Sequence, residues 1–302
     1  MAFPNDTGYA DMVCSLIQPT NDVVGPFGKC MITFISLSVI SSPRLLLLTD
    51  LFIQNIKSQI RAILEDRGGA KKQADHPSIF HELLDSSLPP AEKSFKRLVD
   101  EGVIVVTAGA FTTAHVLTTI SFHLLANPEI LQKLKTELTS AIPGGSVSLK
   151  QLEQLPYLSA VVFEGLRISN SVTSRLPRVS PDIPIIFREW TIPPGTPVSM
   201  TSRMMHENPR IFPEPHEFRP DRWLQGSSKE RLDRYLAPFS KGTRSCIGIN
   251  LAHAELYLTL AAVFREFDLE LYETTREDVD IAHDAFSAAP RLDSKGVRVL
   301  VK

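Results

Sequence analysis

The chain has 302 residues, of which 43% are apolar and 22% charged, a composition too rich in core-forming side chains for a disordered protein. Its 32 basic and 34 acidic residues give a net charge of −2, which argues against electrostatic binding to nucleic acid or to an anionic membrane surface. The three cysteines, Cys14, Cys30 and Cys246, are too scattered for a disulfide framework or a structural zinc site, and a reducing compartment suits them best.

Residues 1–50 carry no motif that assigns them a role, so they are set apart as an unplaced N-terminal segment. The first ten residues include no basic side chain, which leaves a secretory signal unsupported. The apolar stretch Met31–Leu48 is interrupted at Pro43 and predicts a buried or amphipathic helix rather than a membrane span. The main folded portion is therefore expected over residues 51–302.

A helical region follows this segment. Leu51–Leu64 has amphipathic spacing, and the glycine pair after Arg67 is a helix stop signal. Ala91–Ala126 predicts a long helix whose middle, Gly102–Thr119, is almost free of charge. A helix that is apolar on every face has to be buried on every face, so we expect this one to cross the core.

Capping signals divide the next helices. Asn127-Pro128 predicts an N-cap followed by proline at the first position of a helix over Glu129–Ile142, which ends at the Pro-Gly-Gly of 143–145. Ser148–Gln151 has the form of a capping box, and a further helix is expected over Tyr157–Ser169.

The composition changes after residue 176. Ten of the 22 prolines fall within residues 177–220, and this density excludes a long helix there. Ile185–Ile192, the turn Pro193–Thr196 and Pro197–Met200 predict a short hairpin. Ile249–Phe267 returns to helical spacing, and the last thirty residues alternate weakly, as small strands do. The fold class predicted is mainly α with a minor β-region.

The stretch Phe239–Gly248 matches the pattern FxxGxRxCxG. It resembles the haem-binding loop of the cytochromes P450, and the similarity extends over roughly residues 75–302, the C-terminal half of that fold. The resemblance implies a partial cytochrome P450 fold that retains the central helix, the ExxR helix and the helix after the cysteine loop. It also implies haem b as the cofactor, with the Cys246 thiolate as the axial ligand of its iron.

Each residue type in this loop suits that chemistry. A thiolate ligand favours O–O cleavage, and the start of a helix just after Cys246 favours the thiolate form. Gly242 and Gly248 allow sharp turns and close approach to the porphyrin, Arg244 is expected to pair with a haem propionate, and Phe239 to pack near the sulfur. The alternative is that Cys246 is a small buried apolar residue.

Two further stretches resemble family motifs. Glu164 and Arg167 match ExxR within a predicted helix, whereas the same spacing at Glu207–Arg210 and Glu273–Arg276 lacks that context. Arg222 lies in a segment similar to FxPxRW. The resemblance implies a buried ion-pair triad of Glu164, Arg167 and Arg222 that fixes the chain before the cysteine loop; the alternative is an exposed pair of little energetic value.

Other candidates rest on position relative to these motifs. Arg175 falls about where family members place a second propionate-binding base, and Arg178 is an alternative for the same role. His206 matches a family histidine and is expected to form structural hydrogen bonds rather than to bind a metal.

The segment Ala108–Thr113 resembles the family's oxygen-activation segment, AGxxT. Ala108 and Gly109 are small enough to leave room beside the haem, and Thr112 is the residue expected to relay a proton during oxygen activation. The family's acid immediately before this threonine is replaced by Phe111, which cannot carry a proton.

The resemblance implies a fungal-type monooxygenase that inserts one oxygen atom into a small hydrophobic secondary metabolite, such as a terpenoid or polyketide, with electrons from an NADPH-cytochrome P450 reductase. No nucleotide-binding motif is present. The family's location is the cytosolic face of the endoplasmic reticulum, but the family's N-terminal half and membrane anchor are not recognisable here, so a cytoplasmic location stays open. The alternatives are a non-catalytic truncated remnant that binds haem weakly or not at all and, with little support, a cysteine hydrolase using Cys246 and His253.

Overall fold

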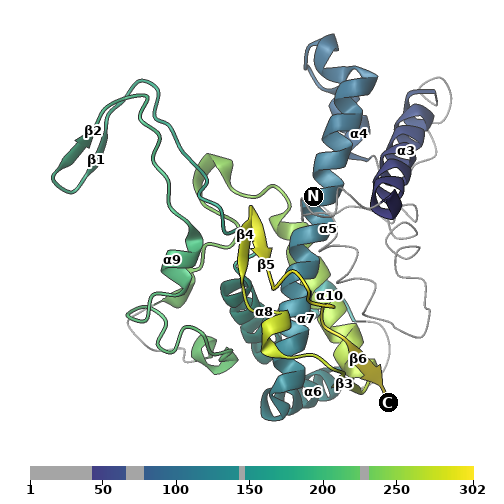
Figure 1. Cartoon of the computed structure of the whole chain (residues 1–302), viewed down its shortest axis with the longest axis vertical. Helices are drawn as coiled ribbons and strands as arrows, with labels where there is room; N and C mark the ends of the chain where they lie inside the picture. The colour runs from purple at the N-terminus through teal and green to yellow at the C-terminus, as the bar shows by residue number, and fades with distance from the viewer. Residues whose placement is uncertain (1–42, 66–77, 143–146, 225–230) are drawn as a thin grey trace.

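The computed structural model describes residues 43–65, 78–142, 147–224 and 231–302 (Figure 1). Most of the apolar stretch Met31–Leu48 and the predicted helix stops at 67–69 and 143–145 lie outside these ranges. The described part is mainly helical, with three two-stranded antiparallel sheets, which confirms the predicted fold class.

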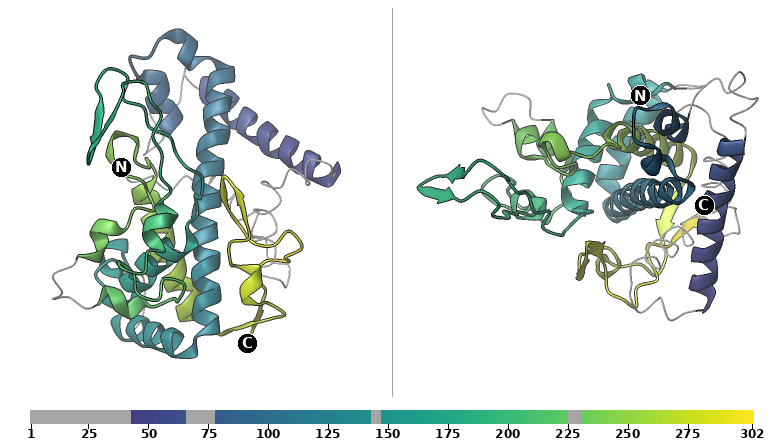
Figure 2. Two further views of the ribbon diagram at one scale, coloured as in Figure 1. Left: turned by 60° about the vertical axis from the view of Figure 1, so that its left-hand side comes forward. Right: turned by 90° about the horizontal axis from the view of Figure 1, so that it is seen from above.

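The helix α5, Phe95–Ala126, is the central element, and the other helices are arranged along it (Figure 2). It begins four residues later than predicted, because Ser94 forms the N-cap and accepts a hydrogen bond from the Arg97 amide at 3.4 Å. Near its N-terminal end it contacts α3, Pro43–Glu65, and along its C-terminal half it contacts α8, Pro156–Ser169, and α10, Ile249–Glu266. The main core lies where these last helices meet.

The prediction that α5 is buried on every face is wrong. Its C-terminal half is well covered, but Ile104 is 59% exposed, and Thr107, Ala108 and Ala110 are also exposed. Among the helices of the described ranges, α5 alone is long and apolar enough to cross a membrane, although it packs against α8 and α10 in the body of the molecule. The lack of charge on α5 therefore reflects an open apolar face as well as a core.

Local capping agrees with the sequence in most places. The capping box of Ser148 and Gln151 is present and opens a short helix, α7, Leu149–Leu152. α6, Pro128–Ala141, begins at Asn127 as predicted, but the Asn127 side chain does not cap it. Its amide instead donates to the His123 carbonyl at 2.7 Å and so closes the end of α5.

The predicted hairpin exists, but its turn was misplaced. β1, Ile185–Phe187, pairs with β2, Trp190–Ile192, and the turn consists of Arg188 and Glu189, with φ of +53° at Arg188. The proline turn after Ile192 follows the hairpin instead, since consecutive prolines lack the amides that a second strand needs. The hairpin projects away from the helical body (Figure 1).

The remaining elements are short. The C-terminal region forms two sheets, one pairing β3, Leu269–Leu271, with β6, Val299–Val301, and the other pairing β4, His283–Ala285, with β5, Ser287–Ala289. This confirms the weak strands predicted there. The other short helices of the described part are α4 Ile79–Asp85, α9 Ser202–His206 and the 3-10 turns Pro90–Lys93, Pro220–Trp223, Leu232–Tyr235, Gly242–Arg244 and Arg276–Asp278.

Candidate functional site

The structure places Glu164 and Arg167 one helical turn apart on α8, where both are fully buried. Arg167 donates from Nε and Nη2 to the two Glu164 carboxylate oxygens at 3.0 and 2.7 Å. Its other N–H groups donate to the backbone carbonyls of His206, Pro215 and Glu217. A buried guanidinium whose donors all have acceptors avoids the penalty of an unpaired buried charge.

Arg222 completes this cluster from the 3-10 turn Pro220–Trp223. Its Nε donates to Glu164 at 3.1 Å, and its side chain is 8% exposed. The Glu164 carboxylate also accepts the Trp223 indole N–H at 2.8 Å and the Arg219 amide at 2.9 Å. The structure thus brings the three predicted residues together, and the alternative of an exposed pair is wrong. The Trp223 contact was missed, although the tryptophan of the motif pointed to it.

His206 is buried beside this cluster and connects it to the chain before the cysteine loop. Its ring lies between the Asn170 side-chain oxygen, 3.0 Å from Nδ1, and the Ala237 amide, which donates to Nε2 at 3.0 Å. Burial is the main cause that lowers the pKa of His206 to about 4, so the ring is neutral at pH 7. His206 is therefore a structural hydrogen-bonding residue, as predicted.

The cysteine loop is closed by a backbone hydrogen bond from the Cys246 amide to the Phe239 carbonyl at 2.9 Å. Gly242 turns the chain at φ of +80°, and a side chain there would meet open space, so conformation rather than crowding favours glycine. Cys246 is exposed, which rules out the buried apolar alternative. At Gly248, the N-cap of α10, a Cβ would come within 3.8 Å of the Cys246 sulfur.

Phe239 anchors the loop to the protein. Its ring packs against the main core and lies 5.3 Å from the His253 ring, which in turn lies 6.2 Å from Tyr257. Burial lowers the pKa of His253, and within the described ranges no hydrogen bond joins it to Cys246. This arrangement gives no support to the cysteine hydrolase.

On α5, the Thr112 hydroxyl donates to the Ala108 carbonyl at 2.9 Å. A Cβ added at Gly109 would find nothing within 4 Å. This stretch therefore presents small side chains and open space next to the exposed Ile104. One turn further along α5, Val116 and Leu117 belong to the main core cluster, against which Phe239 of the loop also packs.

The three arginines considered for binding a propionate differ in their partners. Arg244 and Arg175 are exposed, and neither has a polar partner among the described residues. Arg178 donates to the Ser240 hydroxyl at 3.3 Å and to the Leu176 and Pro177 carbonyls, which ties it to the loop. Arg244 and Arg175 are thus free to bind an anionic group, whereas Arg178 already has acceptors.

These residues fit the haem that the motif implies. An exposed thiol follows a glycine turn at the start of a helix, two guanidiniums have no polar partner among the described residues, and α5 has an apolar, open face. Among the described residues no cluster of three or more His, Cys, Asp or Glu side chains could hold a metal ion. A haem iron needs no such cluster, because the porphyrin supplies most of its ligands.

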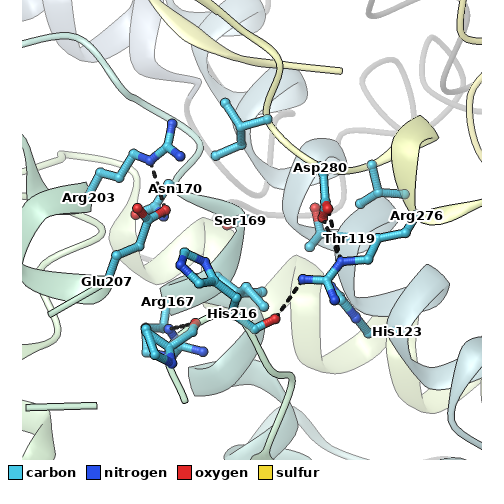
Figure 3. Close-up of a pocket in the computed structure, with 14 residues that line it drawn as sticks. Thr119, His123, Arg167, Ser169, Asn170, Arg203, Glu207, His216, Arg276 and Asp280 are labelled. Atoms are coloured by element: carbon cyan, nitrogen blue, oxygen red, sulfur yellow. Dashed lines mark hydrogen bonds and ion pairs between the residues drawn. The ribbon is translucent and has the colours of Figure 1, made fainter. Parts of the chain in front are cut away.

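A separate cavity of about 200 Å³ has Arg167 among its lining residues (Figure 3). Its walls come from α5, the end of α8, α9 and residues 276–281, and none of the cysteine-loop residues lines it. Two ion pairs occupy its sides, Arg203–Glu207 at 2.8 Å and Arg276–Asp280 at 2.9 Å.

Comparison with known proteins gives one consistent result. The family model for Cytochrome P450 matches residues 16–294. The cytochrome P450 monooxygenase MO6277 of Ascocoryne sarcoides is 48% identical over 83% of this chain and 49% of its own length. The N-acetyltryptophan 6-hydroxylase ivoC of Emericella nidulans is 43% identical over 82% of this chain and 49% of its length. The tryptophan 6-hydroxylase fscE of Fusarium equiseti is 46% identical over 77% and 47%.

The chain spans about half the length of the curated relatives it matches. The matched half contains the cysteine loop, the buried Glu164–Arg167–Arg222 cluster and the open face of α5. The identity extends over most of the chain rather than over a single motif. The chain belongs to the cytochrome P450 family.

Proposed function

We propose that this chain forms the haem-thiolate portion of a monooxygenase that acts on a small hydrophobic secondary metabolite. The observation that carries the proposal is the exposed Cys246 thiol, held at the start of α10 by the hydrogen bond to the Phe239 carbonyl. In the overall reaction a C–H bond of the substrate becomes C–OH, dioxygen supplies that oxygen and one water, and NADPH with one proton supplies the reducing equivalents. A separate reductase would transfer the electrons, since this chain has no nucleotide-binding motif.

The haem, when bound, supplies the activation of dioxygen, and its fifth ligand would be the Cys246 thiolate. The protein's residues hold the group and control its surroundings. Arg244 and Arg175 would bind the propionates, because both guanidiniums are exposed and without polar partners in the described part of the chain. Phe239 and the core cluster below it would keep water away from the sulfur.

On the other side of the pocket, α5 would supply space and a proton path. Ala108 and Gly109 leave room for dioxygen and substrate, because no atom lies within 4 Å of a Cβ placed at Gly109. The Thr112 hydroxyl, which now donates to the Ala108 carbonyl, would turn to donate toward the reacting oxygen. The buried cluster of Glu164, Arg167 and Arg222 would keep α8 and the chain before the loop in fixed positions.

The substrate class rests on the relatives. They include proteins named as hydroxylases of tryptophan and N-acetyltryptophan, alongside several named only as monooxygenases. We therefore propose a small apolar or aromatic substrate, with the terpenoid and polyketide classes as alternatives to an indole. The cytosolic face of the endoplasmic reticulum, the family's usual location, is the proposed location.

A second candidate function is a non-catalytic haem-poor protein. Two observations favour it: Phe111 stands where an acid is expected, and several large apolar side chains are exposed, including Ile247 at 88%. An exposed apolar surface of this kind is typical of a protein–protein contact. The two candidates differ in whether the chain binds haem through sulfur.

Expression with a haem precursor, followed by reduction and exposure to carbon monoxide, separates them. We expect the Soret band of a thiolate-ligated haem, and we expect Cys246→Ala to abolish it while Cys30→Ala leaves it in place. Absence of haem from the purified wild-type protein would favour the second candidate. A thiolate band that persists in Cys246→Ala would overturn the assignment of the ligand.

A further inference from the structure

The cavity that Arg167 lines also contains a buried imidazole without a polar partner. His123 of α5 is 6% exposed and forms part of the cavity wall. Its ring stacks on Phe218, with the ring centres 4.9 Å apart, and meets Phe122 edge-on at 5.3 Å. Within the described ranges no hydrogen bond reaches either ring nitrogen, although buried polar groups are normally hydrogen-bonded. The ring is therefore available to a molecule in the cavity.

Two arginines on the more exposed sides of the cavity also have unused donors. Arg203 of α9 donates from Nε to Glu207 at 2.8 Å, and neither of its terminal nitrogens has an acceptor among the described residues. Arg276 donates from Nε to Asp280 and from Nη2 to the His216 carbonyl at 2.8 Å, which leaves Nη1 without an acceptor in the same ranges. Figure 3 shows the two ion pairs on opposite sides of the view.

The cavity thus offers more hydrogen-bond donors than acceptors. Arg167 contributes none, because all of its N–H groups already donate to Glu164 or to backbone carbonyls. Arg203 keeps both terminal NH2 groups and Arg276 keeps one. Burial is the main cause that lowers the pKa of His123 to about 4, so its ring is neutral at pH 7 and adds one N–H. A ligand that fits this cavity must supply acceptor oxygens.

Charge and size narrow the class of ligand. An N–H group of a guanidinium binds an anionic oxygen roughly twice as strongly as a neutral one, so an anion gains most here. The Arg203–Glu207 and Arg276–Asp280 pairs are partly exposed, and exposed pairs are weak, so a ligand can share each guanidinium with its carboxylate. The volume of about 200 Å³ far exceeds the roughly 10–15 Å³ that one water needs, which leaves room for a small organic molecule.

We propose that this cavity binds a small oxyanion, either inorganic phosphate or a dicarboxylate, whose oxygens accept hydrogen bonds from Arg203, Arg276 and His123. Such a ligand would join α5, α9 and the 3-10 turn Arg276–Asp278 through one molecule. None of the cysteine-loop residues lines the cavity, so the proposal does not depend on the proposed function.

The first test follows the ring of His123 by proton–carbon NMR in the full chain, labelled at histidine, at pH 7. Sodium chloride is replaced by phosphate or by succinate at constant ionic strength. We expect the His123 signal to shift and to saturate with at least one of the two anions, and the lower Kd identifies which kind of oxyanion the site prefers. His123→Phe, which keeps a ring to stack on Phe218, assigns the signal by its loss. A His123 signal that moves with neither anion would overturn the proposal.

Two substitutions should change the Kd for that anion in opposite directions. Arg203→Gln removes charge-assisted donors and should raise the Kd about tenfold. Glu207→Gln removes the carboxylate that competes for Arg203 and should lower the Kd roughly threefold. The matched control is Arg188→Gln, which should leave the Kd unchanged, because Arg188 lies on the projecting hairpin and does not line the cavity.

The opposite signs distinguish a binding site from a general effect on the fold. If Arg203→Gln fails to fold, tighter binding in Glu207→Gln still supports the site, and unchanged binding there counts against it. Equal Kd values in the wild-type protein and in both variants would show that the anion binds elsewhere and would overturn the proposal. Because the carbon monoxide spectrum enters none of these outcomes, failure of this proposal would leave the proposed function standing.

Discussion

Arg167 is among the largest side chains that the fold buries completely, and each N–H group of its guanidinium has an acceptor. Its guanidinium donates to Glu164 and to three backbone carbonyls, and it lies 5.3 Å from the ring centre of Phe212. A buried ion pair of this kind adds little to net stability, because desolvation of both charges offsets their attraction. Its main effect is to favour one folded arrangement over others.

We expect Arg167→Met to lower the free energy of unfolding by about 3–5 kcal/mol, because it leaves the Glu164 carboxylate buried with less than its full set of donors. Urea denaturation followed by circular dichroism measures this change. The matched control is Lys96→Met, which removes one member of the exposed Lys96–Asp100 pair and should cost at most about 0.5 kcal/mol. Equal losses of unfolding free energy in the two variants would show that the buried ion pair contributes no more to stability than the exposed pair.

The sequence could predict these residues but not their full environment. The Glu164–Arg167 spacing and the motif around Arg222 identified the cluster, and its contacts are present in the structure. The choice between Arg175 and Arg178 could not be made from spacing, because it depends on which guanidinium finds acceptors in the folded loop.

At the scale of elements, the packing of α5 against α8 depends on one glycine. A Cβ at Gly165 of α8 would come within 2.1 Å of Ile120 of α5, a residue with no exposed surface. The two helices approach this closely only because the side chain is absent. At Gly109 of α5, by contrast, a Cβ would meet no atom within 4 Å.

Substitution by alanine should change the free energy of unfolding in opposite directions at Gly165 and Gly109. Gly165→Ala should lower the free energy of unfolding by about 1–3 kcal/mol, because the overlap with Ile120 outweighs the better helix propensity of alanine. Gly109→Ala should raise it by about 0.5–1 kcal/mol in the haem-free protein, because propensity acts there alone. Thermal unfolding of both variants measures the difference, and a stabilised Gly165→Ala would contradict the close packing.

Elements with local signals were predicted well, and elements set by distant contacts were not. The starts of α6 and α7 and the extents of α8 and α10 agree with capping residues and apolar spacing. The turn of the β1–β2 hairpin was misplaced, because a proline pair is a strong local turn signal whereas Arg188 is not. The open face of α5 was missed because apolar periodicity does not distinguish a protein neighbour from a bound apolar group.

At the scale of the whole molecule, pH acts through buried histidines. Burial lowers the pKa of both His123 and His206 to about 4, against an ordinary value of 6.5. The folded state therefore binds fewer protons than the unfolded state between these values. The contribution of these two histidines to the free energy of unfolding is fully present above pH 6.5 and is lost as the pH falls toward 4.

We expect the free energy of unfolding to fall between pH 7 and pH 5 by roughly 2 kcal/mol for each of these two histidines. Urea denaturation at the two pH values measures the fall. His206→Gln should remove the share of one histidine, roughly 2 kcal/mol, from this fall, while His123 and the histidines His115 and His253, whose pKa values burial also lowers, keep theirs. A fall of unchanged size in a variant that lacks both His123 and His206 would assign the pH dependence to other groups.

The two tryptophans of the chain lie in contrasting places. Trp190 is 66% exposed on the projecting hairpin, and the Trp223 indole donates its N–H to the buried Glu164 carboxylate. Their fluorescence therefore divides into a water-quenchable, red-shifted component and a shielded one. In Trp190→Phe the remaining fluorescence would report on the ion-pair cluster alone. In Trp223→Phe it would report on any molecule that covers the hairpin. Tryptophan fluorescence therefore distinguishes a structural change around the buried cluster from binding at the hairpin.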